Sequence, residues 1–328
     1  MRRRTLLAAL AALLVATAPA AAGAAATPAR AAARLCAAGS GTTLGSVANP
    51  AIDELSGLVQ STAHPGVLWA NNDSGDTARV FAVGTDGADL GTVTVGGATA
   101  VDWEDLALGP GPGGPDHLYV GDIGGAGTSG NARPTVTVYR FPEPAPPGAG
   151  LTTAVTAQSV TLTYLDGPHD AEALLLDARS GDLVVVTKVT QSAVAGVYRA
   201  PKASTAAAGS TIPLERVGDL GASGRPGLAQ RLAELAGLGD VANSVTAGDA
   251  SARAGVALIR TYSGISAYKW SAKQSLADAL LGSACRAPAP TDPRFPQGEA
   301  VALAANGKHY ITASEGVGAP LVQFRARK

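Results

Sequence analysis

The sequence predicts an all-β fold, a β-propeller with five four-stranded blades as the preferred arrangement. Three observations carry this prediction. A hairpin-like unit recurs five times, further strand-like segments follow the copies, and 41 glycines and 21 prolines in 328 residues favour turns over long helices. Four antiparallel strands per unit indicate blades arranged in a ring.

The repeated unit has an apolar first strand, a glycine-containing turn and a second strand rich in β-branched or aromatic residues, which is typical of a β-hairpin. The five copies begin at Glu54, Glu104, Glu172, Ser244 and Glu299. A third strand-like segment follows each copy, as in TVTVYRF and GISAYKW. The candidates for a fourth strand are LGTVTVGG, SVTLTYLD, TIPLERVGDL and LADALLGSAC.

The fifth copy has no candidate of its own for a fourth strand. The segment RLCAAGSGTTLGSVANP, from Arg34, can supply that strand and so close the ring. This closure would bring Cys36 close to Cys285 in the outer strand of the preceding blade. In an exported chain two cysteines most simply form one disulfide, and two separate buried thiols are the alternative.

The number of blades has an alternative as well. A sixth, degenerate blade could lie between Pro201 and Asn243. Residues 225–239 instead have the apolar spacing of a short amphipathic helix. A helical insertion in a five-bladed ring is therefore the preferred interpretation.

The first 26 residues predict an export signal, because three arginines precede an apolar run and then small residues suited to cleavage. The general secretory route and the twin-arginine route both fit, and the expected location is extracellular. Residues 27–328 are expected to form one propeller domain and a monomer. No later apolar run approaches the ~20 residues that span a bilayer. The formal net charge of −1 disfavours nucleic acid as a partner.

Charged residues at equivalent places in the five units predict two rings at the mouth of the central channel. The first ring would contain the residues that begin the five copies. The second would contain the residues that end them, Asp73, Asp122, Lys188, Arg260 and Glu315. So many carboxylates in one funnel must be offset by protonation, by the two cationic side chains or by a bound metal ion.

Hard oxygen ligands from several blades favour Ca²⁺ as the metal ion. The predicted metal ligands are Asp73, Glu104, Glu172 and Glu299, and the predicted ligand-binding residues are Glu54, Asp122 and Glu315. The alternative is that each carboxylate only accepts backbone N–H bonds and fixes a turn.

Catalytic roles are predicted for three residues in case the protein is an enzyme. His169 could act as a general base or a metal ligand, and Lys188 and Arg260 could stabilise developing negative charge. A structural histidine in a turn is the alternative for His169. The sequence has no G-x-S-x-G motif and no phosphate-binding glycine-rich motif in a βαβ setting, which disfavours a serine hydrolase and a nucleotide-binding enzyme.

The segments Glu54-Leu55-Ser56-Gly57-Leu58, Glu172-Ala173-Leu174 and Glu299-Ala300-Val301 resemble the first strands of blades in secreted bacterial propellers of the lactonase-like, NHL-like and phytase-esterase-like kinds. The resemblance implies the architecture over most of the chain, whereas the same scaffold hosts hydrolases, lyases and binding proteins.

Three functions follow as hypotheses. The first is an exported propeller that binds a divalent cation and a small polar or glycan-like ligand. The others are a metal-dependent hydrolase of lactones or phosphoesters and a structural or protein-interaction disc.

Overall fold

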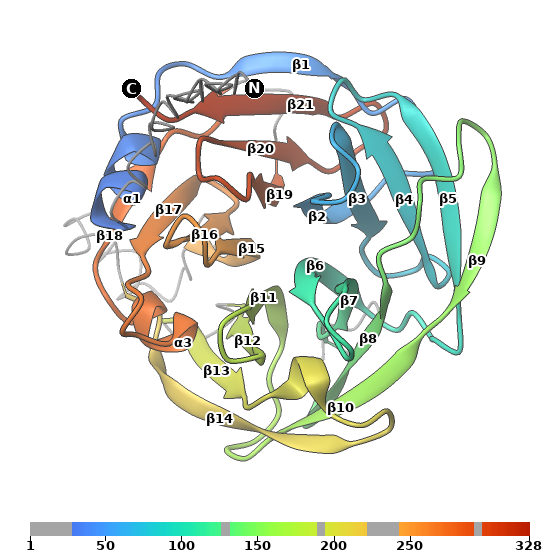
Figure 1. The fold of residues 1–328 in the computed structure, drawn as a ribbon, viewed down its shortest axis with the longest axis vertical. Helices are drawn as coiled ribbons and strands as arrows, with labels where there is room; N and C mark the ends of the chain where they lie inside the picture. Colours follow the sequence, from blue (N-terminus) through green and yellow to red (C-terminus); the bar gives the residue numbers. More distant parts are fainter. Residues whose placement is uncertain (1–27, 126–131, 189–193, 222–242, 292–296) are drawn as a thin grey trace, which may run out of the picture.

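The computed structural model describes residues 28–125, 132–188, 194–221, 243–291 and 297–328. The predicted export signal (1–26) and the predicted helix at 225–239 lie outside these residues. The described chain is mainly β-strand, with strands placed around a central axis (Figure 1). The all-β prediction is confirmed.

The strands form five blades, each with an inner strand near the axis and an outer strand at the rim (Figure 1). Blade 1 contains β2 (Leu55–Gln60), β3 (Val67–Asn72), β4 (Arg79–Gly84) and β5 (Asp89–Gly96). Blade 2 contains β6 (Trp103–Pro110), β7 (Asp116–Asp122), β8 (Thr135–Pro142) and β10 (Gln158–Tyr164). Blade 3 contains β11 (Ala171–Asp177), β12 (Asp182–Thr187), β13 (Gly196–Ala200) and β14 (Thr211–Asp219).

The remaining two blades complete the ring. Blade 4 contains β15 (Val245–Ser251), β16 (Val256–Thr261), β17 (Gly264–Lys269) and β18 (Ala284–Ala287). Blade 5 contains β19 (Gly298–Leu303), β20 (His309–Ser314), β21 (Pro320–Arg325) and, as its outer strand, β1 (Thr42–Ser46). The inner strands touch one another in the closed order β2, β6, β11, β15, β19 and back to β2. Because β11 contacts β15 directly, none of the described residues forms a sixth inner strand between blades 3 and 4.

The N-terminal strand closes the ring as predicted. β1 pairs antiparallel with β21, with Thr42 opposite Gln323. A short helix precedes it, α1 (Pro28–Cys36), which packs against β17 and β18 of blade 4. Cys36 at the end of α1 forms a disulfide with Cys285 in β18, so the predicted staple between the last two blades is confirmed.

The predicted fourth strand LADALLGSAC is only partly correct. Its first half forms the short helix α3 (Leu276–Leu280), and β18 begins at Ala284. The helix starts there because the Ser275 side chain accepts a hydrogen bond from the Asp278 amide, which is a helix N-cap. None of the helices in the described residues is long and apolar enough to cross a membrane.

Outer strands also pair across blades. β10 of blade 2 runs parallel to β14 of blade 3 and joins the two blades into one eight-stranded sheet. An additional strand, β9 (Thr152–Thr156), pairs in parallel with β5 at the rim of blade 1. These lateral pairs give the outer edges of three blades a backbone partner.

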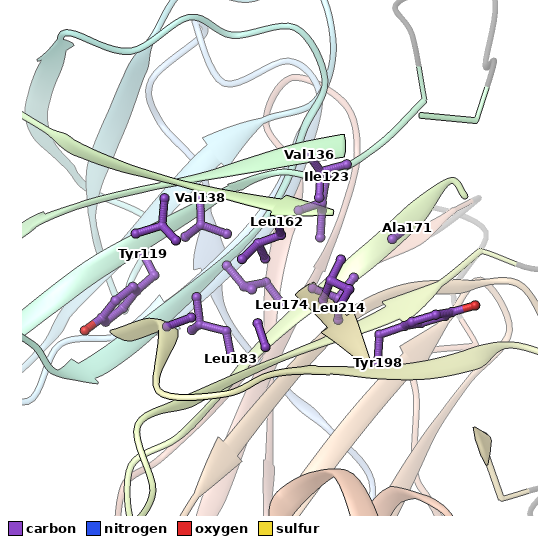
Figure 2. Close-up of a cluster of buried hydrophobic side chains, with 14 of the residues drawn as sticks. Tyr119, Ile123, Val136, Val138, Leu162, Ala171, Leu174, Leu183, Tyr198 and Leu214 are labelled. Atoms are coloured by element: carbon purple, nitrogen blue, oxygen red, sulfur yellow. The ribbon is translucent and has the colours of Figure 1, made fainter. Parts of the chain in front are cut away.

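The core lies between the faces of neighbouring blades. Figure 2 shows this packing between blades 2 and 3, where Tyr119, Val138 and Leu162 meet Leu174 and Leu183. All six residues of β12, with the sequence DLVVVT, are buried, as expected for a strand covered on both faces. The mouth residues therefore rest on a scaffold of fully packed strands.

Candidate metal centre at the channel mouth

Each inner strand carries a β-bulge close to its first residue. In β6, Trp103 pairs with Asp122 and Asp105 pairs with Gly121, so Glu104 has no partner of its own in β7. A bulge re-aims the side chain of the extra residue. The corresponding bulges contain Glu172 in β11, Thr246 in β15, Glu299 in β19, and Ser56 with Gly57 in β2.

The first predicted ring therefore combines two different positions of the repeat. Glu54 and Ser244 precede the bulges by two residues, and Glu54 is exposed. Ser56 and Thr246 are the residues equivalent to Glu104. The sequence prediction missed them because it placed the start of the unit two residues too early in these two blades, at Glu54 and Ser244, whereas the bulges contain Ser56 and Thr246.

Two groups of three carboxylates meet beside the bulges of blades 2 and 3. Within each group, one oxygen atom from every residue lies within 4.8 Å of the others. The first triad is Asp73, Asp102 and Glu104, and the second triad is Glu104, Asp170 and Glu172. Glu104 belongs to both, so the five carboxylates form one continuous acidic cluster that could hold a metal ion.

Asp102 and Asp170 were not among the predicted metal ligands. Each precedes a bulge glutamate by two residues, so the sequence reads Asp-Trp-Glu from Asp102 and Asp-Ala-Glu from Asp170. Side chains two residues apart in an extended strand point to the same side. The Asp-x-Glu pattern at the same place in two blades is the signal that would have found them.

The surroundings of Glu104 give the strongest indication of a cation site. The Glu104 side chain is 3% exposed, and Oε2 is buried without a hydrogen-bond partner. Gly124 leaves the space beside it open, because a Cβ atom there would overlap Oε1 of Glu104 and approach Oδ2 of Asp102. Oδ1 of Asp170, in the second triad, is likewise buried and unpaired in the described structure. Buried polar atoms are normally satisfied, so this cradle of oxygens fits a cation.

Burial and mutual repulsion make it unfavourable for all the clustered carboxylates to be ionised at once. Burial, and then the carboxylates of Glu172, Asp73 and Asp102, raise the pKa of Glu104 well above its usual value. Burial and Asp73 raise the pKa of Asp102 to about 7. Burial also raises the pKa of Asp170. Carboxylates at such short range stay ionised only with nearby positive charge.

Lys188 supplies positive charge to one side of the cluster. Its Nζ forms an ion pair with Oε1 of Glu172, and its backbone amide donates to the Asp170 carbonyl at 2.9 Å. Burial would lower the pKa of Lys188, but Glu172 outweighs it and raises that pKa. Burial raises the pKa of Glu172 to about 7 even with this ammonium group beside it.

Asp73, Lys188 and Glu315 directly follow β3, β12 and β20, the second strands of their blades. They occupy the second predicted ring. Glu315 interacts with Glu299, the bulge residue of blade 5, whose pKa is raised to about 9 by burial and then by Glu172 and Glu315. Neither Glu299 nor Glu315 belongs to a triad of the described residues, but Glu172 and Asp73 of the triads repel them.

Asp122 is misplaced in the predicted second ring. It is the last residue of β7, and the ring position in blade 2 is Ile123, which is buried in the core. The Asp122 carboxylate accepts hydrogen bonds from the amides of Val101 and Asp102 at 3.3 and 3.2 Å. It also forms an ion pair with Arg133 at 2.9 Å. Asp122 therefore holds the backbone that carries Asp102.

Arg260 is also misplaced in that ring, where Tyr262 stands instead. Arg260 lies two residues earlier, inside β16, and its guanidinium is buried against Gly298 of blade 5. A side chain at Gly298 would collide with it. Burial lowers the pKa of Arg260 to about 10 even though Glu299 raises it. The arginine thus lies between blades, beneath the mouth.

His169 turns away from the triads although it precedes Asp170. Its Nε2 lies 3.0 Å from Oδ1 of Asp166 and 2.9 Å from the hydroxyl of Tyr198. Its ring packs against Tyr164 and Tyr198, with centroid distances of 4.8 and 5.0 Å. The described structure therefore places His169 in an aromatic cluster beside Asp166, and not in either triad.

A polar pocket of about 380 Å³ lies at blade 1, lined by residues on both sides of Asp73 in the sequence but not by Asp73 itself. Its volume lies within the range of small-molecule sites. Glu54, one of the predicted ligand-binding residues, lies in its wall. The pocket is lined by Ala51, Asp53, Glu54, Asn72, Ser74, Gly75, Asp76 and Arg79.

The fold and the mouth define a class of protein, a β-propeller with a carboxylate cluster that could hold a metal ion at one end of its channel. No protein-family model matches the sequence. No curated protein matches it either. Among solved structures, the chain is similar to Raptor from Chaetomium thermophilum at 10% identity and a TM-score of 0.36. The match covers 85% of this chain and only 21% of that one.

Replacing Gly124 by alanine is expected to abolish cation binding at the first triad without changing any charge. The new methyl group would occupy the space between Glu104 and Asp102. Calorimetric titration with Ca²⁺ measures the effect. Gly39→Ala is the matched control, because a Cβ at Gly39 meets no atom within 4 Å. Unchanged affinity in Gly124→Ala would show that the cation binds elsewhere.

Proposed function

We propose that this protein is an exported binding propeller that holds Ca²⁺ at the channel mouth and uses the ion to fix a small polar ligand. The observation that carries the proposal is the buried, unpaired Oε2 of Glu104, shared between two carboxylate triads. The Asp73–Asp102–Glu104 triad is the primary site, because the only ion pair to a triad carboxylate in the described structure goes from Lys188 to Glu172.

The donor set supports Ca²⁺ over a transition metal. Every member of the two triads is a carboxylate, and neither contains histidine or cysteine. Ca²⁺ accepts six to eight oxygen ligands in a flexible geometry, whereas Zn²⁺ favours four ligands drawn mostly from nitrogen and sulfur. Three side chains leave coordination positions for water and for the ligand.

The polar pocket at blade 1, whose wall includes the sequence neighbours Asn72 and Ser74 of Asp73, supports a small ligand with hydroxyl or amino groups. Glu54, Asp53 and Asp76 line it and offer acceptors, and Arg79 is the only cationic side chain in its wall. Export is supported by the signal-like residues 1–26 and by the disulfide, because disulfides persist in oxidising compartments.

A metal-dependent hydrolase is the second candidate, favoured by Lys188 beside Glu172, where an ammonium group could stabilise developing negative charge. The placement of His169 and Arg260 supports it less, since neither contacts a carboxylate of the two triads. Hydrolysis of a lactone or a phosphoester by the calcium-loaded protein, lost in Lys188→Met, would favour this candidate over pure binding.

Ca²⁺ is expected to raise the melting temperature of protein purified in EDTA. At one hundred times the dissociation constant, binding to the native state adds about 2.7 kcal/mol, which corresponds to about 5 °C in a chain of this size. In Glu104→Gln the response should disappear, while stability in EDTA stays the same or rises because one like charge is removed. Thermal denaturation over a wide range of Ca²⁺ concentrations measures both.

The matched control is Glu215→Gln, which removes a carboxylate from a surface ion pair with Arg199. This variant should respond to Ca²⁺ as the wild type does. No response in the wild type would contradict the metal site and favour a structural or protein-interaction disc.

A further inference from the structure

The two triads differ in their counter-charge. Lys188 forms an ion pair with Glu172 of the second triad. In the described structure, no lysine or arginine forms an ion pair with Asp73, Asp102 or Glu104. Arg133, the nearest arginine along blade 2, is paired with Asp122 instead. Lys188 therefore contacts the second triad directly, whereas it acts on Asp73 and Glu104 of the first triad only through a longer-range attraction that opposes the rise of their pKa values.

The ammonium group is held firmly at the second triad. The Lys188 amide bonds to the Asp170 carbonyl at 2.9 Å, so the backbone of the lysine is fixed beside that triad. Nζ lies 6.0 Å from the centroid of the Tyr262 ring, which is within cation–π range. The side chain is only 27% exposed. A tethered cation of this kind competes with a free ion at a very high effective concentration.

We propose that Lys188 is the resident cation of the second triad and that the mouth consequently binds one exchangeable Ca²⁺, at the first triad. The second triad would bind a metal ion without Lys188, and the ammonium group of Lys188 takes the place of that ion. This inference rests on the proposed function, because it assumes that the first triad binds Ca²⁺.

The ammonium group compensates only part of the charge of the cluster. Five ionised carboxylates and one ammonium group leave four uncompensated negative charges (5 − 1 = 4), so charge alone would accept two Ca²⁺ ions. The limit of one ion comes from the position of Lys188 at the second triad. Without the ammonium group, the oxygens of Glu104, Asp170 and Glu172 would form a second acidic cradle, within 4.8 Å of one another and with Oδ1 of Asp170 already unpaired.

The number of cations bound at the mouth determines whether it is suited to cleaving a ligand or to binding one. Two cations bridged by Glu104 would suit in-line displacement at a phosphoester, since paired metal ions stabilise both the attacking and the leaving oxygen. One cation beside an ammonium group suits a ligand that places an anionic or hydroxyl oxygen between the two charges. Lys188 thus favours holding a ligand over cleaving one by two-metal chemistry.

Counting Ca²⁺ ions per chain tests the proposal. Equilibrium dialysis and calorimetric titration of the purified protein should give one ion for the wild type and for Lys188→Arg, and two for Lys188→Met. The double variant Lys188→Met, Glu172→Gln should return to one, because it loses a ligand of the newly opened site. Circular dichroism checks that each variant is folded, and Lys188→Gln replaces Lys188→Met if the latter does not fold.

The outcomes separate the two proposals. Two ions in the wild type, or one ion in both the wild type and Lys188→Met, would overturn the role of Lys188 and leave the metal site intact. No Ca²⁺ bound by any variant would overturn the proposed function as well. A second ion that persists in the Glu172→Gln double variant would place it outside the second triad and contradict the proposal.

Discussion

A variant with serine in place of both Cys36 and Cys285 is expected to lose about 5 kcal/mol of unfolding free energy at most, with a correspondingly lower melting temperature. The disulfide joins residues 249 positions apart, and the entropy that a cross-link removes from the unfolded chain grows with the length of the loop. It also ties α1 to blade 4, immediately before the strand that closes blade 5.

Thermal and urea unfolding of the double serine variant, with the reduced wild-type protein for comparison, measure this loss. The two should agree, since both remove the same cross-link. Hydrogen exchange should rise first in α1 and β1, which depend most on the staple. Equal stability of oxidised wild type and variant would show that the β1–β21 pairing and the burial of α1 close the ring without help.

The metal-free protein is expected to lose stability as the pH rises from about 5 to about 8. Asp102, Glu172 and Asp249 have pKa values of about 7 in the folded protein, each raised first by burial, and Glu299 has about 9. In the unfolded chain such groups titrate near pH 4. The folded state therefore binds more protons over this interval, and its stability falls with rising pH by a few kcal/mol in total.

Saturating Ca²⁺ should oppose this trend, because the ion binds the deprotonated carboxylates and replaces the protons. Urea unfolding at both pH values, in EDTA and in Ca²⁺, measures the change. In EDTA, Asp102→Asn should show a smaller loss than the wild type, since one of the titrating groups is gone. Equal stability of the metal-free wild type at the two pH values would mean that the carboxylates are compensated internally.

The architecture could be predicted from the sequence because it depends on short patterns of strand and turn residues that repeat along the chain. The hairpin unit repeats with a glycine at each turn, and Gly181, Gly255 and Gly307 have the positive φ that such a turn requires. The closing strand and the disulfide followed from one missing strand and from two cysteines. Nothing in these inferences needed side-chain positions.

The site was predicted only in part, because its register depends on the bulges. A single extra residue in each inner strand shifts which side chain faces the mouth, and an alignment of acidic residues placed Glu54 there in place of Ser56. The orientation of His169 depends on Tyr198, which comes from another strand of its blade. Partners so far along the chain leave no trace in a local pattern.

The lateral pairing of β10 with β14 has a mechanical consequence for the mouth. Four of the five clustered carboxylates come from blades 2 and 3, which this pairing makes one continuous hydrogen-bonded sheet. The fifth, Asp73, comes from blade 1, which meets blade 2 through side-chain packing and, at the rim, through the parallel pair of β5 with β9, the strand just before β10. A change in the spacing of blades 1 and 2 would therefore alter the distances within the first triad, whereas the second triad lies within one hydrogen-bonded sheet.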